Sequence, residues 1–260
     1  MKRLINYLFL FYFLSGLLAA QPSGREIMNR VDALPGPTDM VTNLKMTLIS
    51  NRGGKVRQRS RELTTYERNY EDEKFVSKSL IRFSQPAEVR GTGFLNWDRR
   101  GNRNDDQWLY LPALKKVKRI QAREQSKNFL GTDFTYEDLA GRSLDADDYE
   151  YLGADLYRGT ECYKVKAVPK DKNTAYSARI IWVDKENWLM KRVEFFDRRG
   201  NRLKILELPD HVKNGKYWTA TTLIMENVRT GHKTLMQVLS VAYDQGLKDD
   251  LFTESFLKRP

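Results

Sequence analysis

The sequence has few of the side chains on which most catalytic and metal sites depend. It contains one cysteine, Cys162, and two histidines, His211 and His232, among 260 residues. A single cysteine excludes an internal disulfide and argues against a zinc cluster. Neither histidine has the spacing of a metal ligand, and no GxSxG motif or phosphate-binding glycine loop is present. We therefore expect a protein that is not an enzyme and that needs no metal or cofactor. Cys162 is expected to be a small buried hydrophobe.

The acidic residues also give little support to catalysis. Adjacent acids occur at Asp105-Asp106, Asp147-Asp148 and Asp249-Asp250. Neighbouring side chains on a strand point to opposite faces, so these pairs are more typical of solvated turns than of a general acid and base. Three further acids are expected to cap or hydrogen-bond a loop, namely Asp133, Glu137 and Asp138.

Long hydrophobic runs are also scarce, because the sequence has only one, from Leu4 to Leu18. It follows the basic pair Lys2-Arg3 and ends in the small residues Ala19-Ala20. The run is shorter than the roughly 20 residues that a membrane-spanning helix needs. This pattern predicts a signal peptide over residues 1–20, cleaved near Ala20, and export to the periplasm as a soluble protein.

Positive charge exceeds negative charge, with a formal net charge of +11. In an exported protein, such an excess favours transient contact with an anionic membrane surface. Nucleic acid is not expected as a partner, because the basic residues are interleaved with acids and the compartment holds none.

One helical segment is predicted near the amino end of the expected mature chain. Ser23 is a suitable N-cap, and Glu26 follows it at the spacing of a capping box. Apolar residues recur at helical spacing, at Ile27, Val31 and Leu34. The helix is expected to end before Pro35-Gly36-Pro37.

Most of the remaining sequence alternates between apolar and polar residues, a pattern typical of strands. Strands are predicted near residues 44–48, 56–66, 75–83, 149–154, 161–168, 176–183, 189–196, 203–212, 217–225 and 233–243. Their short connections, such as the turn over residues 51–54, indicate an antiparallel meander. Because no linker divides it, we expect residues 21–260 to form a single, mainly β domain. A large sheet must hide one face, so we expect a curved antiparallel sheet covered on its concave side by one or a few helices.

The middle of the chain carries three longer motifs. They are GTGFL at residues 91–95, WLYLPALKKVKRI at residues 108–120 and FLGTDFTYEDL at residues 129–139. With a proline after the preceding strand, IWVD at 181–184 and LFT at 251–253, this order resembles the outer-membrane lipoprotein-sorting proteins, relatives of the LolA and LolB carriers. The resemblance covers nearly all of the expected mature chain.

The resemblance implies a half-open β-barrel whose groove holds lipoprotein acyl chains or another lipid. It also implies a partner, an inner-membrane transporter of the resistance-nodulation-division (RND) type. A LolB-like protein would be lipid-anchored, and this chain lacks a cysteine at the expected cleavage site. We therefore expect a soluble shuttle rather than an anchored receptor.

Aromatic side chains are crowded in the middle segment and lie among several glycines. We expect a cargo groove lined by Phe83, Phe94, Leu95, Trp97, Trp108, Tyr110, Leu111, Phe129, Leu130, Phe134 and Trp182. The alternative for each of these residues is that it fills the core.

A basic cluster follows the second motif. It consists of Lys115, Lys116, Lys118 and Arg119. The cluster is either a basic rim that meets anionic head groups or an acidic partner, or a solvated strand and turn.

Three functions are compatible with these features. The first is a periplasmic carrier that shuttles lipid or lipoprotein between inner and outer membranes. The second is an accessory protein that docks on an RND-type exporter and holds no cargo. The third is a glycan-binding or glycan-processing envelope protein, for which only aromatic and acidic residues argue.

Overall fold

A computed structural model describes residues 21–101 and 105–259 of the chain. The signal peptide predicted over residues 1–20 lies outside the described residues.

The predicted helix is present as α1 (Gly24–Asp32). Ser23 and Glu26 form the expected capping box, in which each side chain bonds the other residue's backbone N–H. The helix ends before Pro35, and Ile27 and Met28 are buried against the rest of the protein. The capping box and the apolar spacing therefore predicted this element correctly.

The rest of the described chain is mainly strand. The strands are β1 (Asp39–Arg52), β2 (Lys55–Asn69), β3 (Phe75–Gln85), β4 (Gly93–Arg99), β5 (Asp106–Leu111), β6 (Lys116–Ile120), β7 (Asp147–Tyr157), β8 (Thr160–Pro169), β9 (Tyr176–Asp184), β10 (Met190–Asp197), β11 (Arg202–Glu207), β12 (His211–Asn214), β13 (Tyr217–Ala220), β14 (Thr222–Asn227) and β15 (Lys233–Tyr243).

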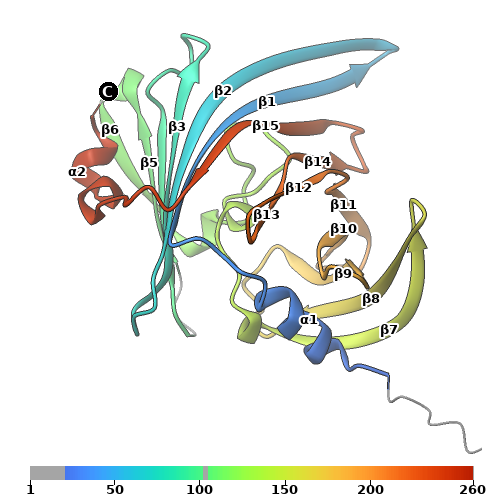
Figure 1. The fold of residues 1–260 in the computed structure, drawn as a ribbon. Helices are drawn as coiled ribbons and strands as arrows, with labels where there is room; N and C mark the ends of the chain where they lie inside the picture. Colours follow the sequence, from blue (N-terminus) through green and yellow to red (C-terminus); the bar gives the residue numbers. More distant parts are fainter. Residues whose placement is uncertain (1–20, 102–104, 260) are drawn as a thin grey trace, which may run out of the picture.

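Within the described residues, thirteen of these strands form one antiparallel sheet in the order β6-β5-β4-β3-β2-β1-β15-β14-β11-β10-β9-β8-β7. Figure 1 shows that the sheet curves around an interior and does not close into a barrel, with β6 and β7 as its two edges. This confirms the predicted fold class. The β1–β2 hairpin turns at Gly53 and Gly54, whose positive φ angles of 58° and 76° suit a tight hairpin.

The sheet departs from a simple meander at two places. β6 and β7 follow one another in the chain but lie at opposite edges, and β1 pairs with β15 to join the two halves of the sheet. The second departure lies between β11 and β14. The predicted strands at residues 203–212 and 217–225 are each broken, because β11 ends at Glu207 and pairs directly with β14. Between them, β12 and β13 form a separate two-stranded sheet. Pro209 lies at the first break. Proline has no backbone N–H to donate to a neighbouring strand, and the strand prediction overlooked this signal.

The sheet is buried on both faces along β3, β4 and β5. On β4, Phe94 joins the large core on the concave side, whereas Leu95 joins a smaller cluster on the convex side. On β5, Leu109 and Trp108 divide in the same way. Two separate covers are therefore needed, one for each face.

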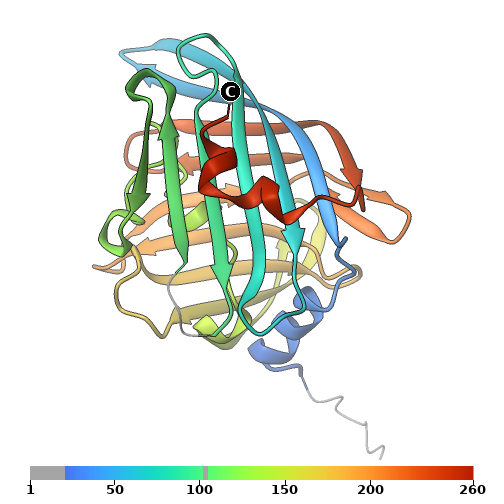
Figure 2. The same ribbon diagram turned by 90° about the vertical axis from the view of Figure 1, so that its left-hand side faces the viewer.

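The two covers come from different parts of the chain. The concave core is covered by α1 and by the 3₁₀ helices η3 (Glu137–Leu139) and η4 (Leu144–Ala146), whose Leu139 and Leu144 pack against it. Two further 3₁₀ helices lie in connections, η1 (Pro112–Leu114) between β5 and β6 and η2 (Ala122–Glu124) after β6. The convex cluster is covered by η5 (Asp249–Phe252) and α2 (Glu254–Leu257). Figure 2 shows this carboxy-terminal segment lying across the outside of the sheet. None of the helices in the described residues is long and apolar enough to cross a membrane.

Candidate functional site

The concave side of the sheet holds an apolar cavity of about 480 Å³. Its walls come from α1, from the segment around η3 and η4, and from β7, β9, β10, β11 and β14. The apolar lining residues are Met28, Val31, Phe134, Ala140, Leu144, Tyr149, Ile181, Met190, Val193, Phe195, Leu206 and Met225. A cavity of this size and polarity is typical of small-ligand sites.

Helix α1 forms one wall of this cavity because of how it sits on β7. A Cβ atom on Gly24 would lie 2.9 Å from backbone atoms of Tyr149 and Glu150, so only glycine allows the helix this close. Met28 and Val31 lie one turn apart on the same face of α1, and both line the cavity. The close approach at Gly24 therefore sets the position of an entire cavity wall.

A cluster of four charged side chains, of which Asp147 and Arg179 are buried, forms another wall. Arg142 bonds Asp147 through both side-chain oxygens, at 2.6 Å and 2.5 Å. Arg179 donates a 3.0 Å hydrogen bond to Glu137, whose other oxygen accepts the Ala175 N–H at 3.1 Å. Burial alone would lower the pKa of Arg142, but the bonds to Asp147 outweigh it and raise that pKa. The four charged side chains therefore form two ion pairs side by side in the cavity wall.

A buried ion pair between a lysine and an aspartate lies next to this cluster. Lys204 Nζ lies 2.5 Å from Asp138 Oδ2, and both side chains are almost fully buried, with exposed fractions of 4% and 5%. Asp138 also accepts a 2.8 Å bond from the Tyr176 hydroxyl and a 2.7 Å bond from the Thr135 N–H. Burial, and then the charge of Asp138, hold the pKa of Tyr176 well above its usual value. Asp138 thus fixes the loop that carries Phe134, as the sequence predicted for the acids of this motif.

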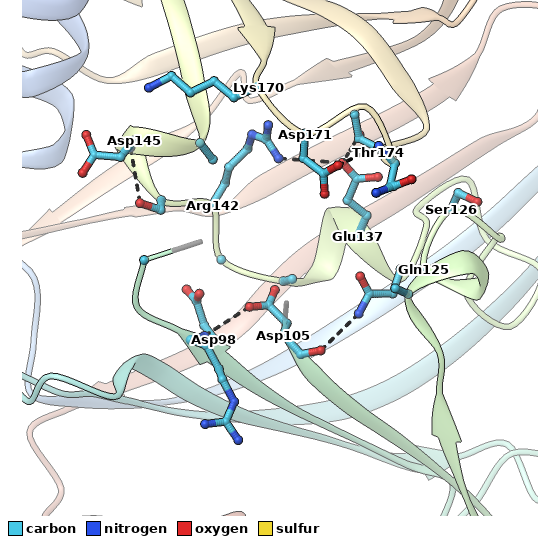
Figure 3. Close-up of a pocket in the computed structure, with 18 residues that line it drawn as sticks. Asp98, Asp105, Gln125, Ser126, Glu137, Arg142, Asp145, Lys170, Asp171 and Thr174 are labelled. Carbon is cyan, nitrogen blue, oxygen red and sulfur yellow. Dashed lines mark hydrogen bonds and ion pairs between the residues drawn. The ribbon is translucent and has the colours of Figure 1, made fainter. Parts of the chain in front are cut away.

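A polar pocket of about 420 Å³ adjoins the charged wall. Figure 3 shows acidic and basic side chains around it, with Asp98 and Asp105 on one side and Lys170 across from them. Burial, and then the neighbouring charge of Asp98, raise the pKa of Asp105 to about 7. Glu137 and Arg142 line both this polar pocket and the apolar cavity. This pocket is too polar for a hydrocarbon chain, so the apolar cavity is the candidate cargo site.

The acidic pairs differ from the prediction of solvated turns. Asp106 is 8% exposed and is paired with Arg99 and Arg119, and Asp147 is 3% exposed. The prediction was wrong for these two acids because the sequence does not show the arginines that neutralise them. In residues 21–101 and 105–259, no group of three or more His, Cys, Asp or Glu side chains could hold a metal ion. Cys162 is fully buried, as predicted, and burial raises its pKa to about 11.

Six of the residues predicted for the groove lie on the concave side. Phe83, Phe94 and Phe129 are at most 1% exposed, and the ring centroids of Phe94 and Phe129 are 5.3 Å apart. These three rings pack on one another in the core. The partly buried Leu111 and Leu130 pack against the same cluster. Of the eleven predicted residues, Phe134 lines the apolar cavity.

The other five predicted residues lie on the opposite face of the sheet. Four of them belong to the convex cluster or pack against it, namely Leu95, Trp97, Trp108 and Tyr110. Trp182 points away from its neighbours Ile181 and Val183, and its indole bonds Asp155 at 3.0 Å. These five residues therefore do not line the cavity, because alternation along each strand sends adjacent side chains to opposite faces.

The predicted basic rim lies at the sheet edge formed by β6. Lys115, Lys116, Lys118 and Arg119 are all exposed. Lys118 pairs with Glu124 at 2.8 Å, and Arg119 pairs with Asp106. The cluster is thus partly neutralised within the protein.

Half of the apolar lining comes from β9, β10, β11 and β14, and none of it was predicted from the sequence as cargo groove. Val193, Phe195, Leu206 and Met225 were predicted only as strand residues, and Ile181 as a strand residue in the IWVD motif. Val193 lies between Arg192 and Glu194 and shows the alternation that places a residue on one face, whereas Ile181 lies between Ile180 and Trp182 and does not. Nothing in the sequence shows that four separate strands bring them to one cavity.

Comparison with known proteins assigns the fold to a family. A family model described as "Uncharacterized protein" matches residues 76–259. The chain is similar to a Vibrio parahaemolyticus domain described as outer membrane lipoprotein-sorting, with 34% identity, a TM-score of 0.85, and 91% of this chain and 98% of that chain covered. The chain belongs to the family of outer-membrane lipoprotein-sorting proteins.

Two further solved structures are similar to the chain. A DUF1329 family protein from Desulfovibrio piger ATCC 29098 is 34% identical, with a TM-score of 0.84 and coverage of 90% of this chain and 97% of that chain. A LolA superfamily protein from Nitrosomonas europaea shares the fold, with a TM-score of 0.71 at 17% identity and coverage of 91% and 100%. No curated protein matches the sequence.

Proposed function

We propose that this LolA-like protein is a periplasmic carrier, without catalytic activity, that shuttles lipid or lipoprotein between the inner and outer membranes. Its cargo would place an acyl chain in the apolar cavity. The observation that carries the proposal is the position of that cavity, on the concave side of the sheet between α1 and five strands. The similarity to a lipoprotein-sorting domain supports the same function.

The chemistry of the lining suits a hydrocarbon chain. Each methylene group that leaves water for an apolar site contributes about 0.8 kcal/mol, so a long chain gains a large binding free energy. Three methionines, Met28, Met190 and Met225, line the cavity. Methionine side chains are flexible and polarisable, and they therefore adapt to chains of different shape.

The membrane contacts belong to the same proposal. The exposed Lys115 and Lys116 at the β6 edge would meet anionic head groups while cargo is exchanged. Residues 1–20 would direct export and be removed. An inner-membrane transporter of the RND type would be the partner that delivers or accepts the cargo.

Cargo can be tested on the protein as isolated from the cell envelope. Native mass spectrometry and lipid extraction should find acyl lipid bound to the wild-type protein. Leu206→Trp places a larger side chain in the cavity and should reduce the bound lipid to a small fraction.

Leu239→Trp is the matched control, because Leu239 is 59% exposed on β15 and does not line the cavity. This variant should retain lipid as the wild type does. A wild-type protein without lipid would contradict the carrier and favour the alternative, an accessory protein that docks on an exporter and holds no cargo.

A further inference from the structure

Arg179 has a nitrogen atom for which the fold provides no hydrogen-bond acceptor. Its side chain is 8% exposed, and it lines the apolar cavity from β9. Nη2 bonds Glu137 at 3.0 Å, whereas Nη1 is buried without a hydrogen-bond partner among the described residues. The closest approach of Asp147 Oδ1 to Nη1 is 3.7 Å, which is too long for a hydrogen bond. Buried N–H groups in folded proteins almost always have an acceptor, so a partner from outside the chain is expected.

The guanidinium is held firmly in this orientation. Its carbon lies 5.0 Å from the ring centroid of Tyr176 and 5.8 Å from that of Phe195. Phe195 itself lines the cavity. Because the rings and Glu137 fix the guanidinium plane, Nη1 keeps a defined position beside the cavity, with no acceptor for its N–H groups among the described residues.

The charges around Arg179 decide which acceptor fits. Arg142 and Arg179 already neutralise Asp147 and Glu137. Asp138, which also lines the cavity, is neutralised by Lys204. Asp32 is a fourth carboxylate in the lining, and both lining cations, Arg142 and Arg179, are already paired. An added anion would therefore meet four carboxylates without an unpaired cation to balance it. A neutral carbonyl oxygen would satisfy Nη1 and leave these pairs intact.

We propose that Arg179 Nη1 donates a hydrogen bond to the ester or amide carbonyl oxygen of an acyl group whose hydrocarbon chain lies in the cavity. This subsite rests on the proposed carrier function and narrows it. The cargo is an acylated molecule, an ester or an amide, rather than a free fatty acid. Arg179 fixes the end of the chain, and the apolar wall accepts the rest.

Two ligands that differ only in this carbonyl group test the subsite on the wild-type protein. 1-Palmitoylglycerol carries an ester carbonyl, and 1-O-hexadecylglycerol has the same chain length and head group with an ether linkage. Hydrogen bonds to charged groups are strong enough that we expect the ester to bind about tenfold more tightly. Palmitate at pH 8 should bind more weakly than the ester. Dissociation constants are obtained by displacement of a fluorescent apolar probe.

Arg179→Lys keeps the positive charge beside Glu137 and Asp147 but removes the planar fork. This variant should bind ester and ether alike. Arg192→Lys is the control, because Arg192 is also ion-paired, with Glu194, on the neighbouring strand β10 and does not line the cavity. It should keep the tenfold preference for the ester.

Each outcome separates the subsite from the carrier function. Equal binding of ester and ether by the wild type would overturn the subsite and leave the carrier standing. Tighter binding of palmitate than of the ester would also overturn it, in favour of a charged head group. Binding of none of the three ligands would overturn both. If Arg179→Lys does not fold, the comparison of ester and ether binding by the wild type still tests the carbonyl subsite.

Discussion

The indole N–H of Trp97 donates a 2.9 Å hydrogen bond to the backbone carbonyl oxygen of Phe252. This bond ties the convex face of β4 to the carboxy-terminal segment, where Phe252 and Leu257 are fully buried. The convex cluster is therefore a second core, separate from the cavity on the concave side. Substitutions in it should change stability without changing cargo binding.

Phe252→Ala should lower the free energy of unfolding by about 3–5 kcal/mol, because it removes a fully buried ring. Phe256→Ala is the matched control in the same segment, where the side chain is only partly buried and the loss should be smaller. Urea unfolding of both variants measures the difference. Equal losses would show that Phe252 does not anchor the segment.

Gly24→Ala should destabilise the protein by about 1–3 kcal/mol, because the new Cβ would overlap backbone atoms of β7 and force α1 outward. It should also weaken acyl binding, since α1 carries Met28 and Val31. Gly36→Ala is the control, because its Cβ would lie 4.0 Å from Asn69 and meet no closer atom. An unchanged affinity in Gly24→Ala would show that α1 does not shape the cavity.

Lys204→Met should cost about 3–5 kcal/mol of stability, because it leaves the Asp138 carboxylate buried without its cation. Lys233→Met is the control on β15. Lys233 pairs with Glu226 at 2.9 Å, but the two side chains are 43% and 34% exposed, so its loss should cost at most about 1 kcal/mol. Similar losses in thermal or urea unfolding would contradict the buried role of Lys204.

Asp105→Asn should change how stability depends on pH. In the folded protein the pKa of Asp105 is raised to about 7, mainly by burial and then by Asp98. A raised acid pKa means that the folded state binds the proton more tightly, so this stability is present at low pH and is lost as pH rises from about 4 to about 7.

The asparagine variant should therefore be more stable than the wild type at pH 8, and this advantage should shrink toward pH 4. The new amide would keep an oxygen acceptor for the Arg99 N–H, which bonds Asp105 at 3.1 Å. Asp145→Asn, at an exposed acid whose pKa is lowered by its bond to Arg25, should not show this gain at pH 8. The urea concentration at the midpoint of unfolding, measured from pH 4 to pH 8 for the wild type and the two variants, tests this prediction. An equal gain at pH 8 in both variants would contradict it.

The sequence predicted the fold well because its signals are local. The capping box at Ser23, the turn at Gly53 and the alternating strands each depend on near neighbours in the chain. The break at Pro209 was also visible in the sequence as a residue that cannot complete a ladder.

The cavity could not be predicted in the same way. Aromatic crowding in residues 83–134 marks segments that are buried on both faces, and the pairs Phe94-Leu95 and Trp108-Leu109 are the local sign of this. Such pairs do not show which face holds a cavity and which is covered by a distant segment. The partners of buried charges, such as Lys204 for Asp138, are likewise set by contacts between remote strands.

Photocrosslinking can locate where an acyl chain binds on the protein. A monoacylglycerol with a photoreactive group in its acyl chain is bound to the protein, activated by light, and its attachment sites are mapped by mass spectrometry. We expect adducts on the cavity wall, in peptides that contain Met28, Met190, Leu206 or Met225. Adducts concentrated around Trp97 and Trp108 on the convex face, or none that depend on the ligand, would contradict this expectation.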